Sequence, residues 1–143
     1  MFSIIVKNDV FFSNHTLTTG IYFAIDELCF PDAEWTDYTV TILSWWCKAL
    51  YKIYDKARAK ARFIFMDGDC YIECNKSKDL LHLRMFLNHT LMQDVSVLKR
   101  DFAVQLIMAV DNVKYLLRNE ESNTINDYLL MHLYQGKLIK RIK

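Results

Sequence analysis

The sequence of 143 residues contains only one proline and three glycines. This low content excludes a loop-dominated scaffold. Long apolar runs are also missing: the most apolar window, residues 38–47, is far shorter than the roughly 18 residues that a membrane-spanning helix needs. The first residues lack the basic segment and the small-residue cleavage site of a signal peptide. We therefore expect neither a targeting segment nor a membrane partner.

Cysteines are few and widely spaced. Cys29, Cys47, Cys70 and Cys74 do not form the tight framework of a disulfide-rich protein, so we expect reduced, buried thiols in a cytoplasmic protein. Cys70 and Cys74 fall on one face of a predicted strand, roughly 13 Å apart at ~3.3 Å per residue. That separation is too large for both thiols to bind one metal ion.

Sequence signatures of common enzymes are missing as well. The chain has no G-x-G-x-x-G, P-loop, H-E-x-x-H or G-x-S-x-G motif. The histidines have no paired spacing, and those within a predicted strand or helix are expected to be structural. They are His15, His82, His89 and His132.

Three carboxylates surround one predicted turn and suggest an acid–base pair. Asp67 is explained by the turn itself and Asp69 by its exposed flank, and neither these residues nor Glu73 is accompanied by a nucleophile or an orienting partner. A small enzyme built on residues 67–73 is therefore the least favoured hypothesis. We expect no enzymatic activity, no cofactor, no metal and no small-molecule substrate.

Composition favours one domain. A hydrophobic content of 52% and an aromatic content of 14% exclude disorder, and a chain of this length buries a core of its own. The net charge of +1 argues against a dedicated nucleic-acid binder. The charges are nevertheless segregated: residues 8–47 hold six carboxylates and no Lys or Arg, whereas residues 48–62 hold six Lys or Arg and one Asp. This segregation predicts separate negative and positive surfaces.

The chain in order predicts strands, a helix, strands and helices. Residues 1–30 read as two N-terminal strands, the second from Leu17 to Phe30 and closed by Pro31. Residues 36–58 read as a long central helix with Thr36 or Asp37 as its N-cap. The side of this helix opposite its apolar stripe is expected to be exposed to solvent. The residues of that solvent-exposed face are Lys48, Lys52 and Lys56.

Residues 62–88 predict a hairpin and a further strand. Asp67-Gly68 between two apolar runs is typical of a two-residue type I′ turn. Helices are expected over 97–135, with Ser96 as a cap, a break at residues 120–123, a second cap at Thr124 and an end at Gly136. The basic tail 137–143 is expected to fray. The predicted fold is α+β: one domain over 1–143, with an antiparallel sheet of about five strands packed against the central helix and two C-terminal helices.

Adjacent tryptophans on a helix point about 100° apart, so Trp45 and Trp46 cannot both lie at the centre of one face. We expect one in the core and the other under a strand or at its rim. A partly exposed tryptophan is a possible interface anchor.

The segment F-P-D-A-E-W-T-D-Y, the helix with Trp45-Trp46 and the run F-x-F-M-D-G-D-x-Y-I-E together resemble a pattern in small bacterial immunity proteins. Those proteins accompany polymorphic toxins and contact-dependent growth inhibition systems. The resemblance extends from about Gly20 to Glu73. The matching positions are Phe30, Pro31, Trp35, Asp37, Trp46, Met66, Asp67, Gly68 and Tyr71.

The resemblance implies a non-enzymatic cytoplasmic toxin inhibitor that binds the C-terminal domain of one cognate toxin, commonly a nuclease. Most matching residues look structural, so the position of the toxin-binding surface is predicted from charge alone. Nucleases are basic because they bind polyanions, and an acidic inhibitor can mimic a polyanion. The predicted toxin-binding residues are Asp26, Glu27, Asp32, Glu34, Asp69 and Glu73.

The alternative hypothesis is a nucleic-acid-associated protein that uses the basic face of the central helix with the tail KLIKRIK. That face comprises Lys48, Lys52, Lys56 and Arg58. No aromatic residue is interleaved with it, although stacking on single strands would require one. We therefore do not expect nucleic acid as the partner.

Overall fold

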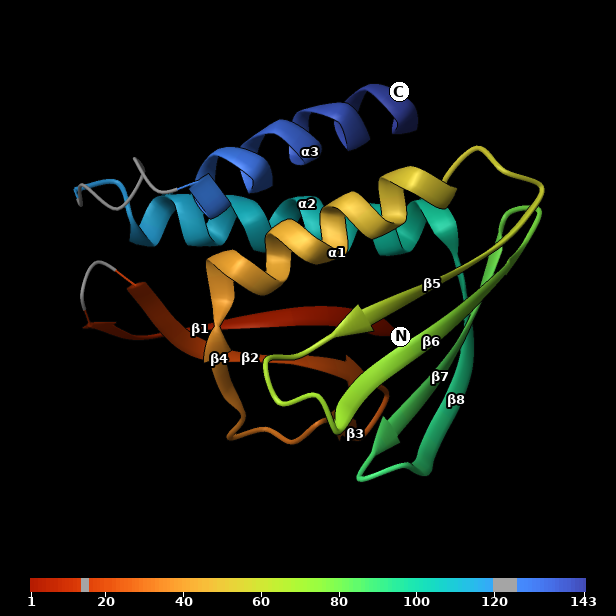
Figure 1. The fold of residues 1–143 in the computed structure, drawn as a ribbon, viewed down its shortest axis with the longest axis horizontal. Helices are drawn as coiled ribbons and strands as arrows, with labels where there is room; N and C mark the ends of the chain where they lie inside the picture. The colour runs from red at the N-terminus through yellow and green to blue at the C-terminus, as the bar shows by residue number, and fades with distance from the viewer. Residues whose placement is uncertain (14–15, 120–125) are drawn as a thin grey trace.

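The computed structural model describes residues 1–13, 16–119 and 126–143. Within them, the fold is α+β, as the sequence predicted, with antiparallel strands and three helices. The expected single sheet of about five strands is wrong, because eight strands form two four-stranded sheets (Figure 1). Helices α1 and α2 lie side by side along the top of the strands, and α3 lies on them in a further layer (Figure 1).

The first sheet is built around β2 (Thr16–Ile25). On one side β2 pairs with β1 (Phe2–Ser13), and on the other it pairs with two short strands in succession. These are β3 (Leu28–Phe30), opposite residues 23–25, and β4 (Thr36–Tyr38), opposite residues 18–20. The predicted continuous strand from Leu17 to Phe30 is therefore divided. Asp26 has a φ of 52°, which aspartate tolerates better than most residues, and the chain reverses there.

The second sheet is a meander of β5 (Arg58–Ile64), β6 (Cys70–Ser77), β7 (Leu80–Leu87) and β8 (Thr90–Leu98). The type I′ turn predicted at Asp67-Gly68 is wrong: neither residue has a positive φ, and the strands are joined by the loop 65–69. The positive φ angles that such a turn requires occur instead at Asn88 (52°) and His89 (64°).

The helices also differ from their predicted bounds. Helix α1 (Thr39–Ile53) starts after Tyr38, not at the predicted caps, because residues 36–38 pair with β2. Helix α2 (Lys99–Leu116) starts after Leu98 and not after Ser96, because β8 extends to residue 98. Helix α3 (Asn126–Ile142) continues through Gly136, so most of the basic tail is helical. The predicted break at 120–123 and the cap at Thr124 lie outside the described residues.

Two lysines from distant segments hold the end of α1. Lys99 Nζ donates to the carbonyl of Tyr54 at 3.0 Å, and Lys76 Nζ donates to the carbonyl of Lys56. Helix ends leave carbonyls without intrahelical partners, and cations there also interact favourably with the helix dipole. Burial lowers the pKa of Lys76. The helix ends at Ile53 and not at residue 58 as predicted, because the chain from Arg58 onward pairs with β6.

An aromatic cluster joins the two sheets and the helices. The Trp46 side chain is fully buried, its ring centroid lies 5.1 Å from that of Phe23 and 5.2 Å from that of Phe65, and its indole Nε1 donates to the Ile64 carbonyl at 2.8 Å. Trp45, by contrast, is 37% exposed. The predicted division between one core and one rim tryptophan is confirmed.

We expect Trp46→Ala to lower the free energy of unfolding by about 3–5 kcal/mol, because it empties the centre of this cluster. Urea denaturation monitored by circular dichroism measures the loss. Trp45→Ala is the matched control, with an expected loss of about 1 kcal/mol. Equal losses in the two variants would contradict this assignment of the core.

Candidate functional site

The six predicted toxin-binding carboxylates do not form one patch. Asp26 and Glu27 lie in the β2–β3 turn, where the Asp26 carboxylate binds the N-terminal amino group at 2.6 Å. Glu73 lies on the outer face of the second sheet between Arg62 and Arg84, with nitrogen–oxygen distances of 3.0 and 3.7 Å. These three residues are therefore separate from the others.

The Asp37 carboxylate connects the β3–β4 loop, the start of α1 and the β5–β6 loop. It accepts hydrogen bonds from the Trp35 indole Nε1 at 3.0 Å, the Tyr38 backbone N–H at 2.8 Å and the Met66 backbone N–H at 3.2 Å. Asp37 is 6% exposed, so these donors replace the water that a buried carboxylate would otherwise need. The sequence predicted a helix cap at Asp37; the structure shows a link between two loops.

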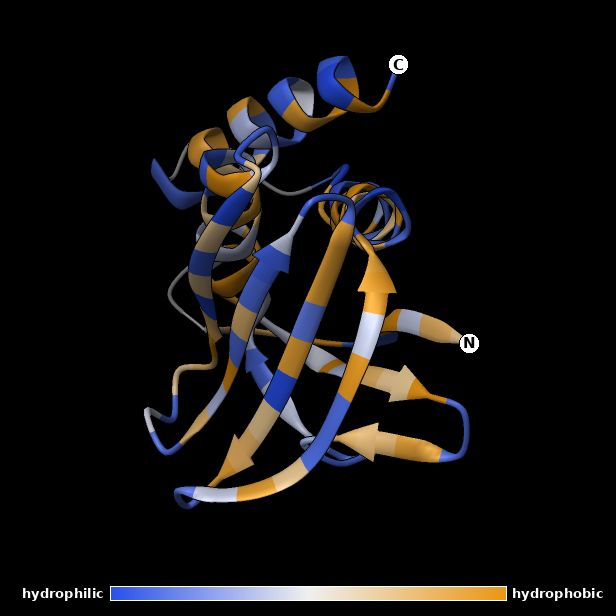
Figure 2. Ribbon diagram, turned by 90° about the vertical axis from the view of Figure 1, so that its right-hand side faces the viewer, coloured by the Kyte–Doolittle hydropathy of each residue, from blue (hydrophilic) through white to orange (hydrophobic). Residues whose placement is uncertain are grey.

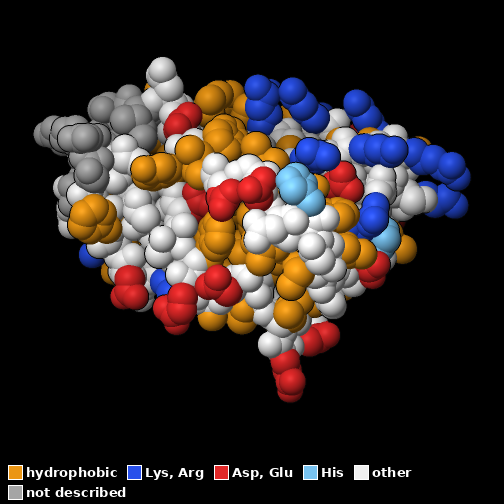
Figure 3. All heavy atoms as spheres, turned by 60° about the horizontal axis from the view of Figure 1, so that its bottom comes forward, with side chains coloured by type: hydrophobic (Ala, Val, Ile, Leu, Met, Phe, Trp, Pro, Cys, Tyr) orange, Lys and Arg blue, Asp and Glu red, His pale blue; other side chains and the backbone are white. Residues whose placement is uncertain are grey.

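The loops that Asp37 joins carry further acidic and apolar side chains, which we call the acidic edge. It comprises Asp32, Glu34, Trp35, Tyr38, Met66, Asp67 and Asp69. Between the loops lies a hollow of about 270 Å³ with no Lys or Arg among its lining residues. Those residues are Thr18, Trp35, Thr36, Asp37, Tyr38, Met66 and Asp67. Figure 3 views the molecule from this side: acidic side chains and exposed apolar atoms are interspersed, while most Lys and Arg in view gather at the upper right.

The apolar members of the acidic edge are partly exposed. Tyr38 and Met66 each expose 45% of their surface. Trp35 is half-buried, with its ring edge-on to Phe65 at 5.8 Å. Large side chains with this exposure remain available to a partner while their positions are fixed by the core beneath.

Lys7 and His89 lie near the acidic edge but leave its carboxylates exposed. Lys7 Nζ is 3.7 Å from Glu34, whose side chain is 90% exposed, and His89 Nε2 is 3.4 Å from Asp69. Exposed ion pairs of this kind stabilise a protein little and are screened by salt. Glu34 and Asp69 therefore remain accessible to a stronger cationic partner.

The buried thiol of Cys70 lies under the acidic edge. Its pKa is raised to about 12, first by burial and then by the negative charges of Asp67, Asp37 and Asp32. All three negative charges act on Cys70, although they come from two segments distant in sequence. Asp67 was predicted as a turn residue, and its place on the acidic edge depends on tertiary contacts that no sequence signal indicated.

The other cysteines do not form a reactive site. Burial raises the pKa of both Cys47 and Cys74 to about 12, whereas Cys29 is only half-buried. In residues 1–13, 16–119 and 126–143, no three His, Cys, Asp or Glu side chains are grouped so as to hold a metal ion. The carboxylates suggested as an acid–base pair are separated: Asp67 accepts from the Asp69 backbone N–H, and Glu73 lies between two arginines.

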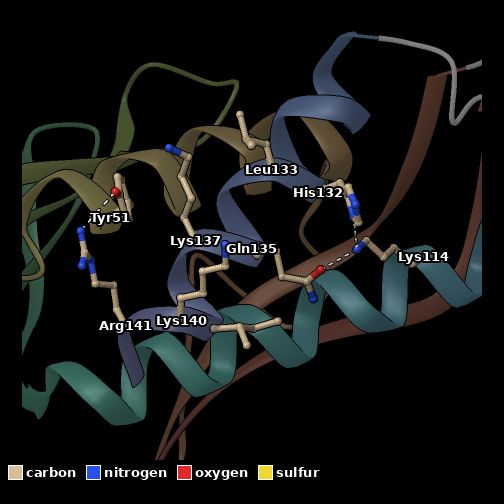
Figure 4. Close-up of a pocket in the computed structure, with 10 residues that line it drawn as sticks. Tyr51, Lys114, His132, Leu133, Gln135, Lys137, Lys140 and Arg141 are labelled. Carbon is tan, nitrogen blue, oxygen red and sulfur yellow. Dashed lines mark hydrogen bonds between the residues drawn. The ribbon is translucent and has the colours of Figure 1, made fainter. Parts of the chain in front are cut away.

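A hollow of about 640 Å³ adjoins α3 on the opposite side (Figure 4). Lys114 Nζ lies 2.6 Å from His132 Nδ1 and donates to Gln135 Oε1 at 2.5 Å. Arg141 pairs with Asp55 at 2.9 Å and donates to the Tyr51 hydroxyl at 3.3 Å. Burial lowers the pKa of Lys114. These contacts fasten α3 to α1 and α2, so we assign them a structural role.

Comparison of the chain with family models, curated proteins and solved structures gave no match. Among the described helices, none combines the length and the apolar character needed to cross a membrane. The functional proposal therefore rests on this chain's own residues.

We expect one fast-reacting thiol per folded chain. At pH 8 a thiol with a pKa of about 12 is ionised in roughly one molecule in 10⁴, and only the thiolate reacts. Titration with Ellman's reagent should therefore detect Cys29 quickly and the other three cysteines after denaturation in urea. Cys29→Ser should remove the fast phase; a fast phase that persists would show that a second thiol is accessible.

We expect Asp37→Ala to destabilise the fold by about 3 kcal/mol, because it leaves several donors without an acceptor. Thermal and urea unfolding measure this loss. Glu27→Ala removes an exposed carboxylate from the β2–β3 turn, and its effect should stay within about 0.5 kcal/mol. If Asp37→Ala unfolded no more readily than Glu27→Ala, Asp37 would not be the connection between the two loops.

Proposed function

We propose that this chain is a cytoplasmic immunity protein that binds one basic toxin domain, of the nuclease class, through the acidic edge and inhibits it in a one-to-one complex. The observation that carries the proposal is the acidic edge itself. It combines carboxylates from two loops with partly exposed Trp35, Tyr38 and Met66 around a hollow without Lys or Arg.

Charge supports this choice of partner. A nuclease must present a positive surface to the phosphates of its substrate. Asp32, Glu34 and Asp67 offer that surface carboxylates in place of phosphates. Such complementarity raises the association rate and disfavours acidic or neutral proteins.

The apolar side chains of the acidic edge supply binding energy, whereas the charges mainly raise the association rate. Binding energy in protein interfaces concentrates in a few large side chains at the centre, surrounded by polar groups that exclude water. Trp35 and Met66 border the hollow, and Asp37 binds both the Trp35 indole and the Met66 backbone. Because the two loops are joined before a partner arrives, less conformational entropy is lost on binding.

The first test is co-purification with the product encoded immediately upstream of this chain, followed by rescue of cells that express the C-terminal domain of that product. A one-to-one complex and restored growth would establish immunity. No complex and no rescue would overturn the proposal.

Charge-neutral variants then test the position of the interface. We expect the triple variant Asp32→Asn, Glu34→Gln, Asp67→Asn to associate with the toxin domain about tenfold more slowly at low salt, because steering by the acidic edge is lost. The difference should shrink at high salt. Surface plasmon resonance measures both rates.

The matched control is Asp26→Asn with Glu27→Gln, at the opposite end of β2. Its association rate should match that of the wild type. If the control slowed association and the triple variant did not, the complex would stand but the acidic edge would not be its interface.

A further inference from the structure

The groove between α1 and β5 is lined by basic side chains and one exposed tryptophan. It has a volume of about 350 Å³. Trp45, Lys48 and Lys52 line it from α1, and Lys60 and Arg62 line it from β5. Its floor is apolar, formed by Ala49, Ile53 and Ala61. We call it the basic groove.

The sequence predicted the lysine row of α1 as a solvated face without an aromatic neighbour. The structure places Trp45 in the same groove because positions 45, 48 and 52 share one face of the helix. It also adds Lys60 and Arg62 from β5. The sequence predicted Arg62 as the start of the hairpin and placed Lys60 in no element. Of the predicted basic set, Lys56 and Arg58 are exposed near the end of α1 but do not line the groove.

The basic groove continues onto the outer face of the second sheet. A neighbouring hollow of about 360 Å³ shares Lys60, Ala61 and Arg62 with it and reaches Arg84. Glu73, between the two arginines, is the only carboxylate among the residues that line either hollow. Figure 2 shows this face of the sheet toward the reader, with no helix lying in front of it.

Aromatic rings lie beside this path, next to Arg62. Tyr71 on β6 and Phe86 on β7 stack with a centroid distance of 5.2 Å, and the Arg62 guanidinium lies 4.7 Å from the Tyr71 centroid. Both rings are half-buried. On the surface, the positively charged Arg62 therefore lies between two aromatic side chains, Trp45 and Tyr71.

We propose that the basic groove and the adjoining sheet face bind single-stranded nucleic acid, with Lys48, Lys52, Lys60 and Arg62 on the phosphates and Trp45 stacked on a base. The two walls present cations at matching intervals: four residues along a helix span about 6 Å, and two residues along a strand span about 6.6 Å. A flexible chain of phosphates with planar bases complements a groove of this composition. A duplex does not, because its bases are already stacked and cannot reach Trp45.

This inference goes beyond the proposed function and does not depend on it. The basic groove and the acidic edge share no residue. A substitution in the basic groove therefore changes no residue of the acidic edge, and the two proposals can be tested independently.

The test is fluorescence anisotropy of the full chain with a labelled oligothymidylate or oligouridylate of about 20 nucleotides and with a duplex of equal length, at about 50 and 200 mM salt. We expect the single strands to bind more tightly than the duplex. Each phosphate contact contributes about 0.7 to the slope of log K against log salt for single strands. Lys60→Gln with Arg62→Gln should therefore reduce that slope by about 1.4, since two contacts are lost.

Trp45 has a separate readout. Trp45→Ala should weaken binding about tenfold, and Trp45→Phe should retain most of the affinity while losing the quenching of tryptophan fluorescence that stacking produces. Arg118→Gln, the loss of one charge just after α2, is the control and should bind like the wild type. The inference is overturned by no binding at low salt, by a preference for the duplex, or by Arg118→Gln weakening binding as much as the groove variants.

Discussion

The hydrogen bonds accepted by the Asp37 carboxylate determine how the two halves of the molecule meet at the acidic edge. Tyr38 belongs to the strand that precedes α1, whereas Met66 belongs to the loop between two strands of the other sheet. A buried carboxylate is costly unless its oxygens are satisfied. The donors must therefore stay in place, and with them the backbone of both loops. The buried Asp37 therefore also fixes the positions of the side chains that these loops expose.

The distribution of charge follows from the same arrangement. The chain carries a net charge of only +1, yet the edge built on residues 31–38 and 65–69 is acidic and the groove between α1 and β5 is basic. The β5 strand takes part in both, because the loop that follows it reaches Asp37 while its exposed Lys60 and Arg62 face the groove. Separation of this kind gives each surface a field of its own sign, so that oppositely charged partners approach different sides.

Much of the fold was predictable where a local pattern decides the structure. Three predictions follow from the helical or strand period: the apolar stripe of α1, the alternation along β6 and β7, and the different burial of Trp45 and Trp46. The β4 strand was missed because its three residues have no pattern of their own and pair only when β2 is present. The type I′ turn was predicted from Asp67-Gly68, but bonds to Asp37 and Cys70 hold that loop in another conformation.

The candidate site was predictable only in part. Asp32, Glu34 and Asp69 were singled out by charge and lie on the acidic edge, whereas Glu73 was chosen by the same argument and lies between arginines on another face. Charge in the sequence shows which side chains are acidic but not which cations will neutralise them. Tyr38 and Met66 were not selected, because their exposure depends on how far the two loops approach each other.

The most direct test of this account is amide hydrogen exchange at Tyr38 and Met66 in the free protein, measured by NMR. If Asp37 joins the two loops before any partner binds, both amides are protected, and Asp37→Asn accelerates the exchange of both while the amides of α2 remain protected. If the Met66 amide of the wild type exchanged as fast as that of an unstructured peptide, the loops would not be joined and the acidic edge would not be preformed.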